Sequence, residues 1–302
     1  LTLLYRMSGK HQGHYYIPNG GIDSLIDALV SSAEEAGVEF MSETLVKEII
    51  IENSQNGLKA IGVKTHNSEE IKADRIISGV DPKQTFINLV GAHNTEIEFS
   101  NRINRLRSNG YVAKFNLALS SLPSFMGLDS LRGRMLIAPT MDSIEFAWDD
   151  AKYGDYSQNP VMDMIIPTLF NPSMAPEGKH TLSANIMYIP YQKKGGWSEE
   201  DKNELTEKII DTISQYSTNI RDNILHSELL TPLDLETEFN LTGGHWHHGE
   251  LALDQMLMMR PTYEAAQYRT PIDKLYLCSA GCHPGGGIMG AAGYNAAKEI
   301  IK

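Results

Sequence analysis

The chain has 302 residues, 41% of them hydrophobic and 21% charged, which is the composition of a globular protein with enough apolar material for a sizeable core. Its formal net charge of -12 and its pI near 5.3 argue against nucleic acid or an anionic lipid surface as the main partner, because phosphate-rich surfaces attract basic patches. Its apolar runs are far shorter than the roughly 20 residues that a membrane-spanning helix needs, so the sequence predicts a soluble protein without a transmembrane segment.

The first third of the sequence predicts a helix, a small antiparallel meander and two further helices. Apolar residues recur at helical spacing from Ile22 to Ala36, and Gly37 is at a position where helices commonly end. β-Branched residues between polar turns then predict four strands, at Val38–Phe40, Val46–Glu52, Leu58–Thr65 and Ile71–Val80. The break at Asp81–Pro82 is followed by two expected helices, at Lys83–Val90 and Glu96–Ser108.

The middle of the chain has a different pattern of residues, and this pattern predicts a second sheet. Long loops rich in Pro, Gly, Asp and Asn separate four expected strands, at Tyr111–Ser120, Arg134–Ala138, Val161–Phe170 and Thr181–Pro190. Ser198 can cap a helix whose apolar residues, among them Leu205 and Ile209, share one face. We expect this helix to cover the second sheet.

The carboxyl end combines a short strand at Lys274–Gly281 with a glycine-rich turn and a small-residue helix at Gly285–Lys302. Backbone N–H groups at a helix amino terminus favour an anion or a partly negative heteroatom, and glycines let such a ligand come close. Gly285, Gly287 and Gly290 satisfy GxGxxG, but a dinucleotide fingerprint also needs a second strand and an acidic residue about 20 positions on. Because only residues 291–302 follow, the turn cannot start a complete dinucleotide-binding unit. We infer that the turn is either one half of a ligand site whose other half comes from elsewhere, or a close-packed turn without a ligand.

Several motifs together resemble the phytoene desaturase and amine oxidase family of FAD-dependent oxidoreductases. The segment from Tyr268 onward is similar to that family's closing motif, in which a strand leads into His-Pro-Gly-Gly-Gly and a helix starts against the flavin. Other stretches with counterparts in the family follow in the expected order: Tyr16–Gly21, Ile76–Pro82, Leu241–Gly244, His248–Glu250 and Met259–Pro261. The resemblance therefore covers essentially the whole chain.

The resemblance implies FAD as the cofactor and assigns residues to it. Val46 matches the position whose backbone meets the adenine, and Gly281 matches the strand-end glycine beside the pyrophosphate and ribityl chain. The residues that match the turn and helix start facing flavin N1 and the C2 carbonyl are Gly285, Gly286, Gly287, Ile288 and Met289. Helix-terminal N–H groups would stabilise the negative charge that reaches N1 on reduction.

Two departures from the family pattern limit this assignment. Relatives often carry an acidic residue after the strand-end glycine, whereas this chain has Cys282–His283, so the ribityl contact cannot be transferred. No strand-helix-strand unit with GxGxxG and a downstream acid precedes residue 20 or occurs elsewhere, and that unit normally holds the ADP moiety. We therefore expect this chain to be a fragment that binds FAD weakly or not at all by itself and is inactive alone. Its expected partner is the missing amino-terminal segment of the same protein.

The remaining polar clusters give candidates for a substrate pocket and argue against a metal. His245 and His247 would share a face of a strand and could hold zinc with Glu250, but further ligands at suitable spacing are missing, so no metal is expected. The substrate-pocket candidates near the flavin are His248, Glu250 and Met259. Arg260 could pair with an acidic substrate or brace its own loop, and we favour the brace.

The cysteines and the first residue bear on location and completeness. Cys278 and Cys282 have a spacing typical of neither a zinc knuckle nor a C-x-x-C redox pair, which favours a reducing, cytoplasmic location, with peripheral membrane association left open. The chain starts at Leu1 without features of a signal or transit peptide, which is typical of a cut or processed end.

These observations predict an α+β protein with two domains. Residues 1–90 and 260–302 form a partial FAD-binding domain, and residues 91–259 form an inserted substrate domain with a mixed or antiparallel sheet covered by helices. As function we expect dehydrogenation of a lipophilic or amine small molecule by the complete enzyme, with no general acid or base identifiable. A noncatalytic binding protein that kept the fold and an unrelated enzyme with a coincidental glycine turn remain as alternatives.

Overall fold

The computed structural model describes residues 7, 16–55 and 57–302, and its contacts divide into two compact units. The first, here called the glycine-turn unit, comprises Phe40–Asn109 and Phe239–Lys302. The second, here called the five-stranded unit, comprises Gly110–Glu238 and the preceding described residues up to Glu39. The expected domain boundaries lay after residues 90 and 259, whereas the contacts change after residues 39, 109 and 238. The segment after residue 90 packs with the glycine-turn unit because its Phe99 and Ile103 belong to that unit's core.

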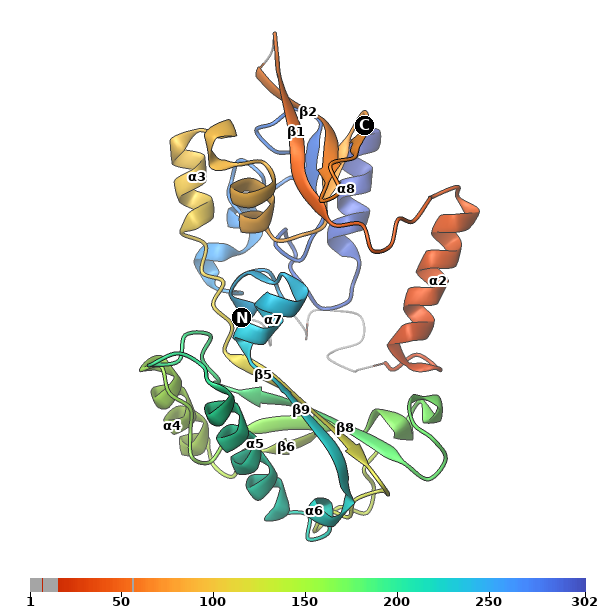
Figure 1. The fold of residues 1–302 in the computed structure, drawn as a ribbon, viewed down its shortest axis with the longest axis vertical. Helices are drawn as coiled ribbons and strands as arrows, with labels where there is room; N and C mark the ends of the chain where they lie inside the picture. Colours follow the sequence, from red (N-terminus) through yellow and green to blue (C-terminus); the bar gives the residue numbers. More distant parts are fainter. Residues whose placement is uncertain (1–6, 8–15, 56) are drawn as a thin grey trace. The chain divides into compact units, whose positions relative to one another are not determined.

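The five-stranded unit contains one antiparallel sheet with the strand order β6-β7-β8-β5-β9 (Figure 1). Its strands are β5 (Val112–Leu119), β6 (Met135–Ile137), β7 (Met162–Ile165), β8 (His180–Met187) and β9 (Ile224–Leu230). Burial alternates along β5, so that Phe115, Leu117 and Leu119 point into the core and the residues between them lie on the second face. This antiparallel sheet confirms the expected second sheet.

Helix α5 (Glu199–Ser214) packs on the core face of this sheet and confirms the predicted cap and apolar stripe. The Ser198 hydroxyl accepts a hydrogen bond from the Asp201 N–H at 3.1 Å, and the Asp201 carboxylate accepts one from the Ser198 N–H at 3.0 Å. Leu205 and Ile209 are fully buried.

Four elements of this unit were not predicted: helix α4 (Met141–Lys152), helix α6 (Ile220–Asn223), strand β9 and helix α7 (Pro232–Phe239). Helix α4 buries only Ala147 and Ala151, so it has a weak apolar stripe, and its best signal was the reciprocal Thr140–Ser143 cap. Strand β9 is at the edge of the sheet and lacks a clear alternation of burial. Short 3-10 turns occupy Pro167–Leu169 and Pro172–Met174.

The predicted amino-proximal helix is α2 (Gly21–Glu35), and Gly37 ends it as expected. Gly37 has φ +84°, its N–H donates to the Glu34 carbonyl at 2.9 Å, and the Val38 N–H donates to the Ala33 carbonyl at 3.0 Å. This pair of bonds is the Schellman arrangement, which a glycine adopts without steric cost. Because Val38 takes part in the helix end, the predicted strand at Val38–Phe40 is wrong.

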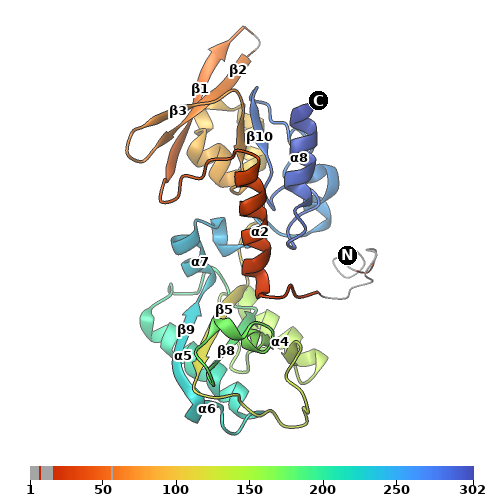
Figure 2. The same cartoon turned by 90° about the vertical axis from the view of Figure 1, so that its right-hand side faces the viewer.

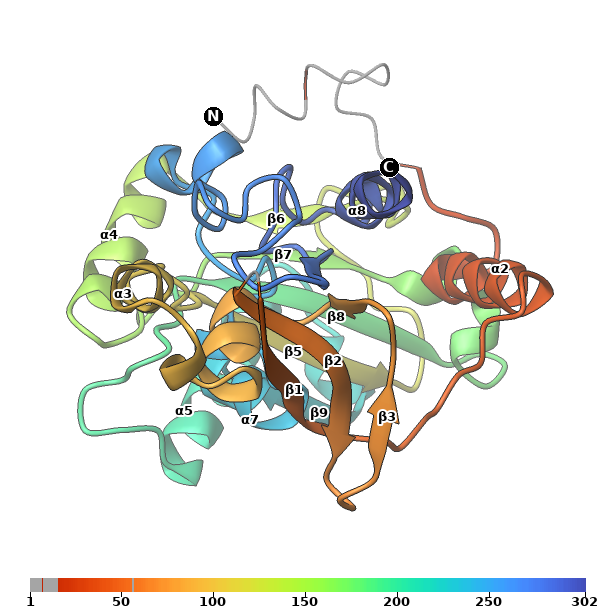
Figure 3. The ribbon, with the colours of Figure 1, turned by 90° about the horizontal axis from the view of Figure 1, so that it is seen from above.

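The glycine-turn unit contains a three-stranded antiparallel sheet of β1 (Val46–Ser54), β2 (Gly57–Thr65) and β3 (Glu70–Lys72), which confirms the meander (Figure 3). The predicted strand Ile71–Val80 is split, because β4 (Ile76–Ser78) leaves the meander and pairs in parallel with β10 (Leu275–Leu277). The register places Ile76 opposite Leu275. Parallel pairing needs a distant segment, which local sequence patterns did not show.

Helix α8 (Ala291–Ile301) runs alongside β10, and Ala292 and Ala296 share a core with Leu275 and Leu277 (Figure 2). The other helices of this unit are the π-helix Gln84–Leu89 and α3 (Ile97–Asn104), with 3-10 turns at Ala92–Asn94, Thr242–Gly244, Leu253–Gln255 and Leu257–Met259. Together the two units confirm the α+β prediction. Across the described residues, no helix has both the length and the apolar content to cross a bilayer.

Candidate functional site

Strand β10 leads into the glycine-rich turn, and Gly281 holds that turn against the end of β4. A Cβ at Gly281 would lie 2.5 Å from Cδ of Pro82, so a larger residue would push the two strand ends apart. Because β4 and β10 are parallel, their carboxyl ends lie side by side. The structure thus brings together two motifs that lie about 200 residues apart in the sequence, Ile76–Pro82 and the glycine-rich end.

The helix after the turn begins at Ala291, not at Gly285 as the sequence analysis predicted. Gly285 (φ +101°), Gly287 (φ +125°), Ile288 (φ +59°) and Gly290 (φ +62°) all have left-handed backbone, which an α-helix does not contain. The residues proposed to face the flavin, Gly285–Met289, therefore form a turn that leads into α8 rather than its first turn.

The outer part of this turn is open. Gly287, Ile288, Met289 and Gly290 are exposed, Ile288 at 77% of its surface. The first main-chain bond of α8 runs from the Tyr294 N–H to the Gly290 carbonyl, so the N–H groups of the first helical turn point outward without helical partners. The dipole of an 11-residue helix adds partial positive charge at the same end.

The inner part of the turn packs tightly on His247. A Cβ placed on Gly286 would lie 2.3 Å from Nδ1 of His247, and one on Gly285 would lie 3.1 Å from Cδ2 of Leu251. Only glycine at position 286 lets the turn lie directly on the imidazole ring. The glycines therefore give the turn one open side and one side in contact with the loop around His247.

The loop that carries His247 is anchored at its start. The Thr242 hydroxyl donates to Asp81 at 2.7 Å, and the same buried carboxylate accepts the Gln84 N–H at 3.0 Å. A Cβ on Gly243 (φ +68°) would lie 2.2 Å from the Ser108 carbonyl oxygen. The Leu241–Gly244 motif thus fastens the loop to two segments of the glycine-turn unit, at Asp81 and at Ser108.

Burial keeps two histidines of this loop neutral at pH 7. Burial lowers the pKa of His245 to about 4, and the neighbouring His247 and Arg260 act in the same direction. Burial also lowers the pKa of His248, although Asp81 opposes that shift. Nδ1 of His248 and Nδ1 of His283 are buried and have no hydrogen-bond partner among the described residues. Buried polar atoms are normally satisfied, so these two nitrogens are available to a bound molecule or water.

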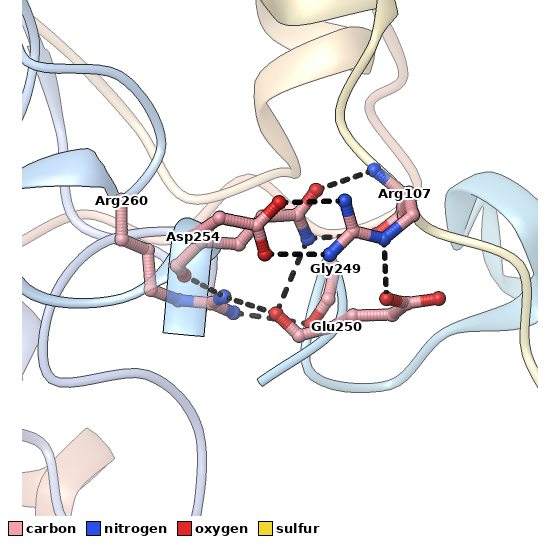
Figure 4. Close-up of polar contacts among 6 residues, drawn as sticks. Arg107, Gly249, Glu250, Asp254 and Arg260 are labelled. Carbon is pink, nitrogen blue, oxygen red and sulfur yellow. Dashed lines mark hydrogen bonds and ion pairs between the residues drawn. The ribbon is translucent and has the colours of Figure 1, made fainter. Parts of the chain in front are cut away.

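Arg260 braces the loop from within, as the sequence analysis favoured (Figure 4). Arg260 is 3% exposed, and all of its partners among the described residues are main-chain carbonyls. The acceptors are His247 at 2.6 Å, Ala280 at 2.8 Å, Glu250 at 3.0 Å, Gln255 at 3.1 Å and Gly249 at 3.3 Å. One guanidinium therefore ties the His247 loop to the end of the β10 strand.

Arg107 holds the same loop from the outside (Figure 4). Its Nε donates to Glu250 at 2.7 Å, and its two terminal nitrogens donate to Asp254 at 2.9 and 2.7 Å. Gln255, which is 5% exposed, accepts the Arg107 N–H at 2.7 Å and donates to the Arg107 carbonyl at 3.1 Å. The Glu250 carboxylate is thus engaged with Arg107.

The other predicted site residues lie in the same unit. Val46 begins β1 opposite Thr65 and packs at the edge of the core. Met259 is 43% exposed and directly precedes Arg260. Within the described residues no group of three or more His, Cys, Asp or Glu side chains is arranged to hold a metal ion. Cys278 and Cys282 are free thiols, and burial raises the pKa of Cys282 to about 12.

A polar network on the second face of the five-stranded sheet was not predicted from the sequence. Lys114 Nζ donates to Asn185 at 3.2 Å, and the Asn185 amide donates to Asp163 at 3.0 Å, where Arg134 also binds. Burial lowers the pKa of Lys114. The strict alternation from Val112 to Leu119 could have shown that Lys114 and Asn116 share this face.

A hollow of about 440 Å³ opens in the same unit. Its lining combines apolar side chains, among them Leu131 and Met164, with the polar side chains of Ser130, Arg132 and Arg134. Its size is in the range of small-molecule sites.

The glycine-turn unit fits the flavin end of an FAD molecule. The exposed segment at Gly287 and Ile288, together with the N–H groups of the first turn of α8, suits a partly negative edge of the flavin ring. Among the described residues, two imidazole nitrogens near the turn, those of His248 and His283, have no hydrogen-bond partner, and no carboxylate binds Arg260.

Comparison with known proteins agrees with this geometry. The family model "Flavin containing amine oxidoreductase" matches residues 1–301. Pyridine nucleotide-disulfide oxidoreductase domain-containing protein 2 of Mus musculus is 35% identical over 316 residues, covering 100% of this chain and 54% of the mouse protein. Phytoene desaturase of Neurospora crassa is 25% identical, covering 94% of this chain and 47% of its own length.

Among solved structures, an oxidoreductase from Methanosarcina mazei has a TM-score of 0.58 at 16% identity, covering 99% of this chain and 58% of that one. The chain thus spans about half the length of the curated relatives it matches. Three observations agree: the motifs that lead into the glycine turn, the fold, and the family match. The chain belongs to the flavin-containing amine oxidoreductase family.

Proposed function

We propose that the complete protein containing this chain is an FAD-dependent oxidoreductase, similar to phytoene dehydrogenases, that dehydrogenates a lipophilic or amine small molecule. Family membership supports the flavin chemistry, and one relative is named as a phytoene desaturase. The observation that carries the proposal is the exposed turn before α8, which is backed by His247 at Gly286.

The residues of this chain orient the cofactor. FAD, when bound, supplies the chemistry by accepting a hydride from the substrate. When FAD is bound, the N–H groups of Gly287, Ile288 and the first turn of α8 would donate toward the flavin edge where negative charge collects. By the resemblance to the family, Gly281 would set the end of β10 beside the pyrophosphate and ribityl chain, and the main chain of Val46 would meet the adenine. Gly285, Gly286 and Met289 complete the turn.

We assign the substrate side of the site to His248, Glu250 and Met259. His248 is neutral at pH 7, and its buried Nδ1 has no hydrogen-bond partner in the part of the chain that the structure describes, which suits a hydrogen bond to a neutral polar group. Met259 offers a flexible apolar surface of the kind that accommodates lipophilic molecules. Glu250 acts through its bond to Arg107, which holds the loop in place.

The ADP half of FAD is proposed to be held by a further segment of the same polypeptide, so that this chain alone binds FAD weakly or not at all. Titrating the purified chain with FAD tests this point, and submicromolar binding would refute it. The full-length gene product should carry the visible absorbance of flavin. A full-length protein that neither purifies with flavin nor binds added FAD would refute the enzymatic proposal and favour a noncatalytic role. The two free thiols favour a cytoplasmic location, which cell fractionation tests.

A further inference from the structure

Arg260 carries a buried positive charge that no described carboxylate balances. Its described hydrogen-bond partners are all main-chain carbonyls. The acidic group that acts on it is the Cys282 thiol, whose pKa is raised to about 12 and which is therefore neutral at pH 7. Carbonyl dipoles satisfy the N–H groups but do not cancel the net charge, and burying an unpaired charge is costly.

This charge lies beside the glycine turn. Nε of Arg260 is 3.7 Å from the position of a Cβ on Gly285. Its other contacts lie on both sides of the turn, at the carbonyl of Ala280 before it and at the carbonyl of His247, whose ring packs on Gly286. A ligand lying on the open side of the turn would therefore lie within the field of the guanidinium.

Arg107 provides the contrast. It braces the same loop, but it is half exposed and two carboxylates, those of Glu250 and Asp254, balance its charge. The ion pairs raise the pKa of Arg107, whereas burial lowers the pKa of Arg260. The loop is thus held by Arg107, whose charge two carboxylates balance, and by Arg260, whose charge no described carboxylate balances and whose Nε lies beside the turn at Gly285.

We propose that Arg260 is a positioning residue whose unbalanced charge stabilises the negative charge that the flavin gains on reduction. Uptake of a hydride breaks a C–H bond of the substrate, oxidises the substrate and leaves one additional negative charge on the flavin ring system. A fixed cation in a water-poor environment lowers the free energy of that charged state without reorganising. This inference rests on the proposed function and names the residue that tunes the cofactor.

The test uses the full-length protein with FAD and three variants, Arg260→Gln, Arg260→Lys and the matched control Arg107→Gln. The readouts are the midpoint potential of bound FAD, the dissociation constant of oxidised FAD and the thermal midpoint of unfolding. Arg260→Gln should make the potential more negative and weaken binding of reduced FAD, relative to oxidised FAD, on the order of tenfold. Arg260→Lys, which keeps the charge, should recover most of that shift. Arg107→Gln should lower the thermal midpoint slightly and leave the potential unchanged.

Two results would overturn the inference. The first is an unchanged potential in a folded, FAD-loaded Arg260→Gln protein. The second is an equal shift in the Gln and Lys variants, which would assign the effect to loop bracing. If Arg260→Gln does not fold, a pH titration of the reduced wild-type protein tests the inference instead. Free reduced FAD takes up a proton as the pH falls, and bound reduced FAD should keep the spectrum of its anionic form to a lower pH than free FAD does. Protonation at the same pH as free FAD would overturn the inference. A wild-type protein without flavin would overturn the proposed function as well, so the two failures differ.

Discussion

Replacing Gly286 by alanine tests the contact between the glycine turn and His247. The new Cβ would lie 2.3 Å from Nδ1 of His247, where ordinary contacts are 3.4–4 Å. The backbone at Gly286 does not have positive φ, so the cost of alanine is steric and not conformational. His247 cannot retreat freely because its carbonyl is bound to Arg260 at 2.6 Å. Overpacking of this kind costs about 1–3 kcal/mol, and we expect a loss of that size.

Urea unfolding of the chain, followed by fluorescence, measures this loss. Trp246 reports on the glycine-turn unit because it is the tryptophan beside His247, with ring centroids 6.5 Å apart. Gly293→Ala is the matched control. It lies in α8 with no atom within 4 Å of its new Cβ, and alanine in a helix is about 0.5–1 kcal/mol more favourable than glycine.

A double-mutant cycle separates this clash from other effects. In a His247→Ala background the imidazole ring is gone, so Gly286→Ala should lose most of its cost, giving a coupling of about 1 kcal/mol or more. An equal loss in both backgrounds would refute the reasoning. So would a Gly286→Ala protein as stable as the parent.

Three further outcomes follow from the same unit. Gly243→Ala should cost more than Gly286→Ala in urea unfolding, because its Cβ would meet the main-chain Ser108 oxygen at 2.2 Å and its φ of +68° strains a non-glycine residue by about 1–2 kcal/mol in addition; equal stability of the two variants would contradict this. Gln255→Ala leaves the main-chain N–H and carbonyl of Arg107 unsatisfied and should cost about 1–3 kcal/mol of stability. Arg107→Gln removes largely exposed ion pairs and should cost about 0–1 kcal/mol. A lower thermal midpoint for Arg107→Gln than for Gln255→Ala would show that the ion pairs dominate. The folded-state pKa of His245 lies below its ordinary value, so the unfolded chain takes up this proton first and stability should fall as the pH drops from about 6.5 toward about 4. His245→Asn should flatten that pH dependence in urea midpoints, and an unaltered slope would contradict the assignment.

Local patterns predicted the fold best where one segment carries its own signal. The helix ended by Gly37, the cap at Ser198 and the hairpin of β1 and β2 were all readable because capping residues and alternation act over a few positions. The pairing of β4 with β10 was not readable, because nothing in Ile76–Ser78 specifies a partner about 200 residues away. Edge strand β9 and the surface helix α4 were missed because they bury little.

The site was predictable in part through resemblance to a family and in part through glycine chemistry. The glycines of the turn could be identified, but their left-handed backbone shifted the start of α8 from Gly285 to Ala291. The contact of Gly286 with His247 could not be predicted, because it depends on how the loop folds back. Arg260 was predicted to be a brace, but the absence of a carboxylate partner for it among the described residues could be seen only in three dimensions.

The pairing of β4 with β10 also sets the order in which parts of the chain can fold during translation. The strands of the five-stranded sheet all lie between Val112 and Leu230, so that sheet can close while later codons are still being read. Strand β4 must wait until Leu275–Leu277 leaves the ribosome, and closing a flexible loop of this length would cost roughly 5 kcal/mol in entropy. A folded insert shortens the effective loop, so early formation of the five-stranded sheet lowers the entropy cost of pairing β4 with β10.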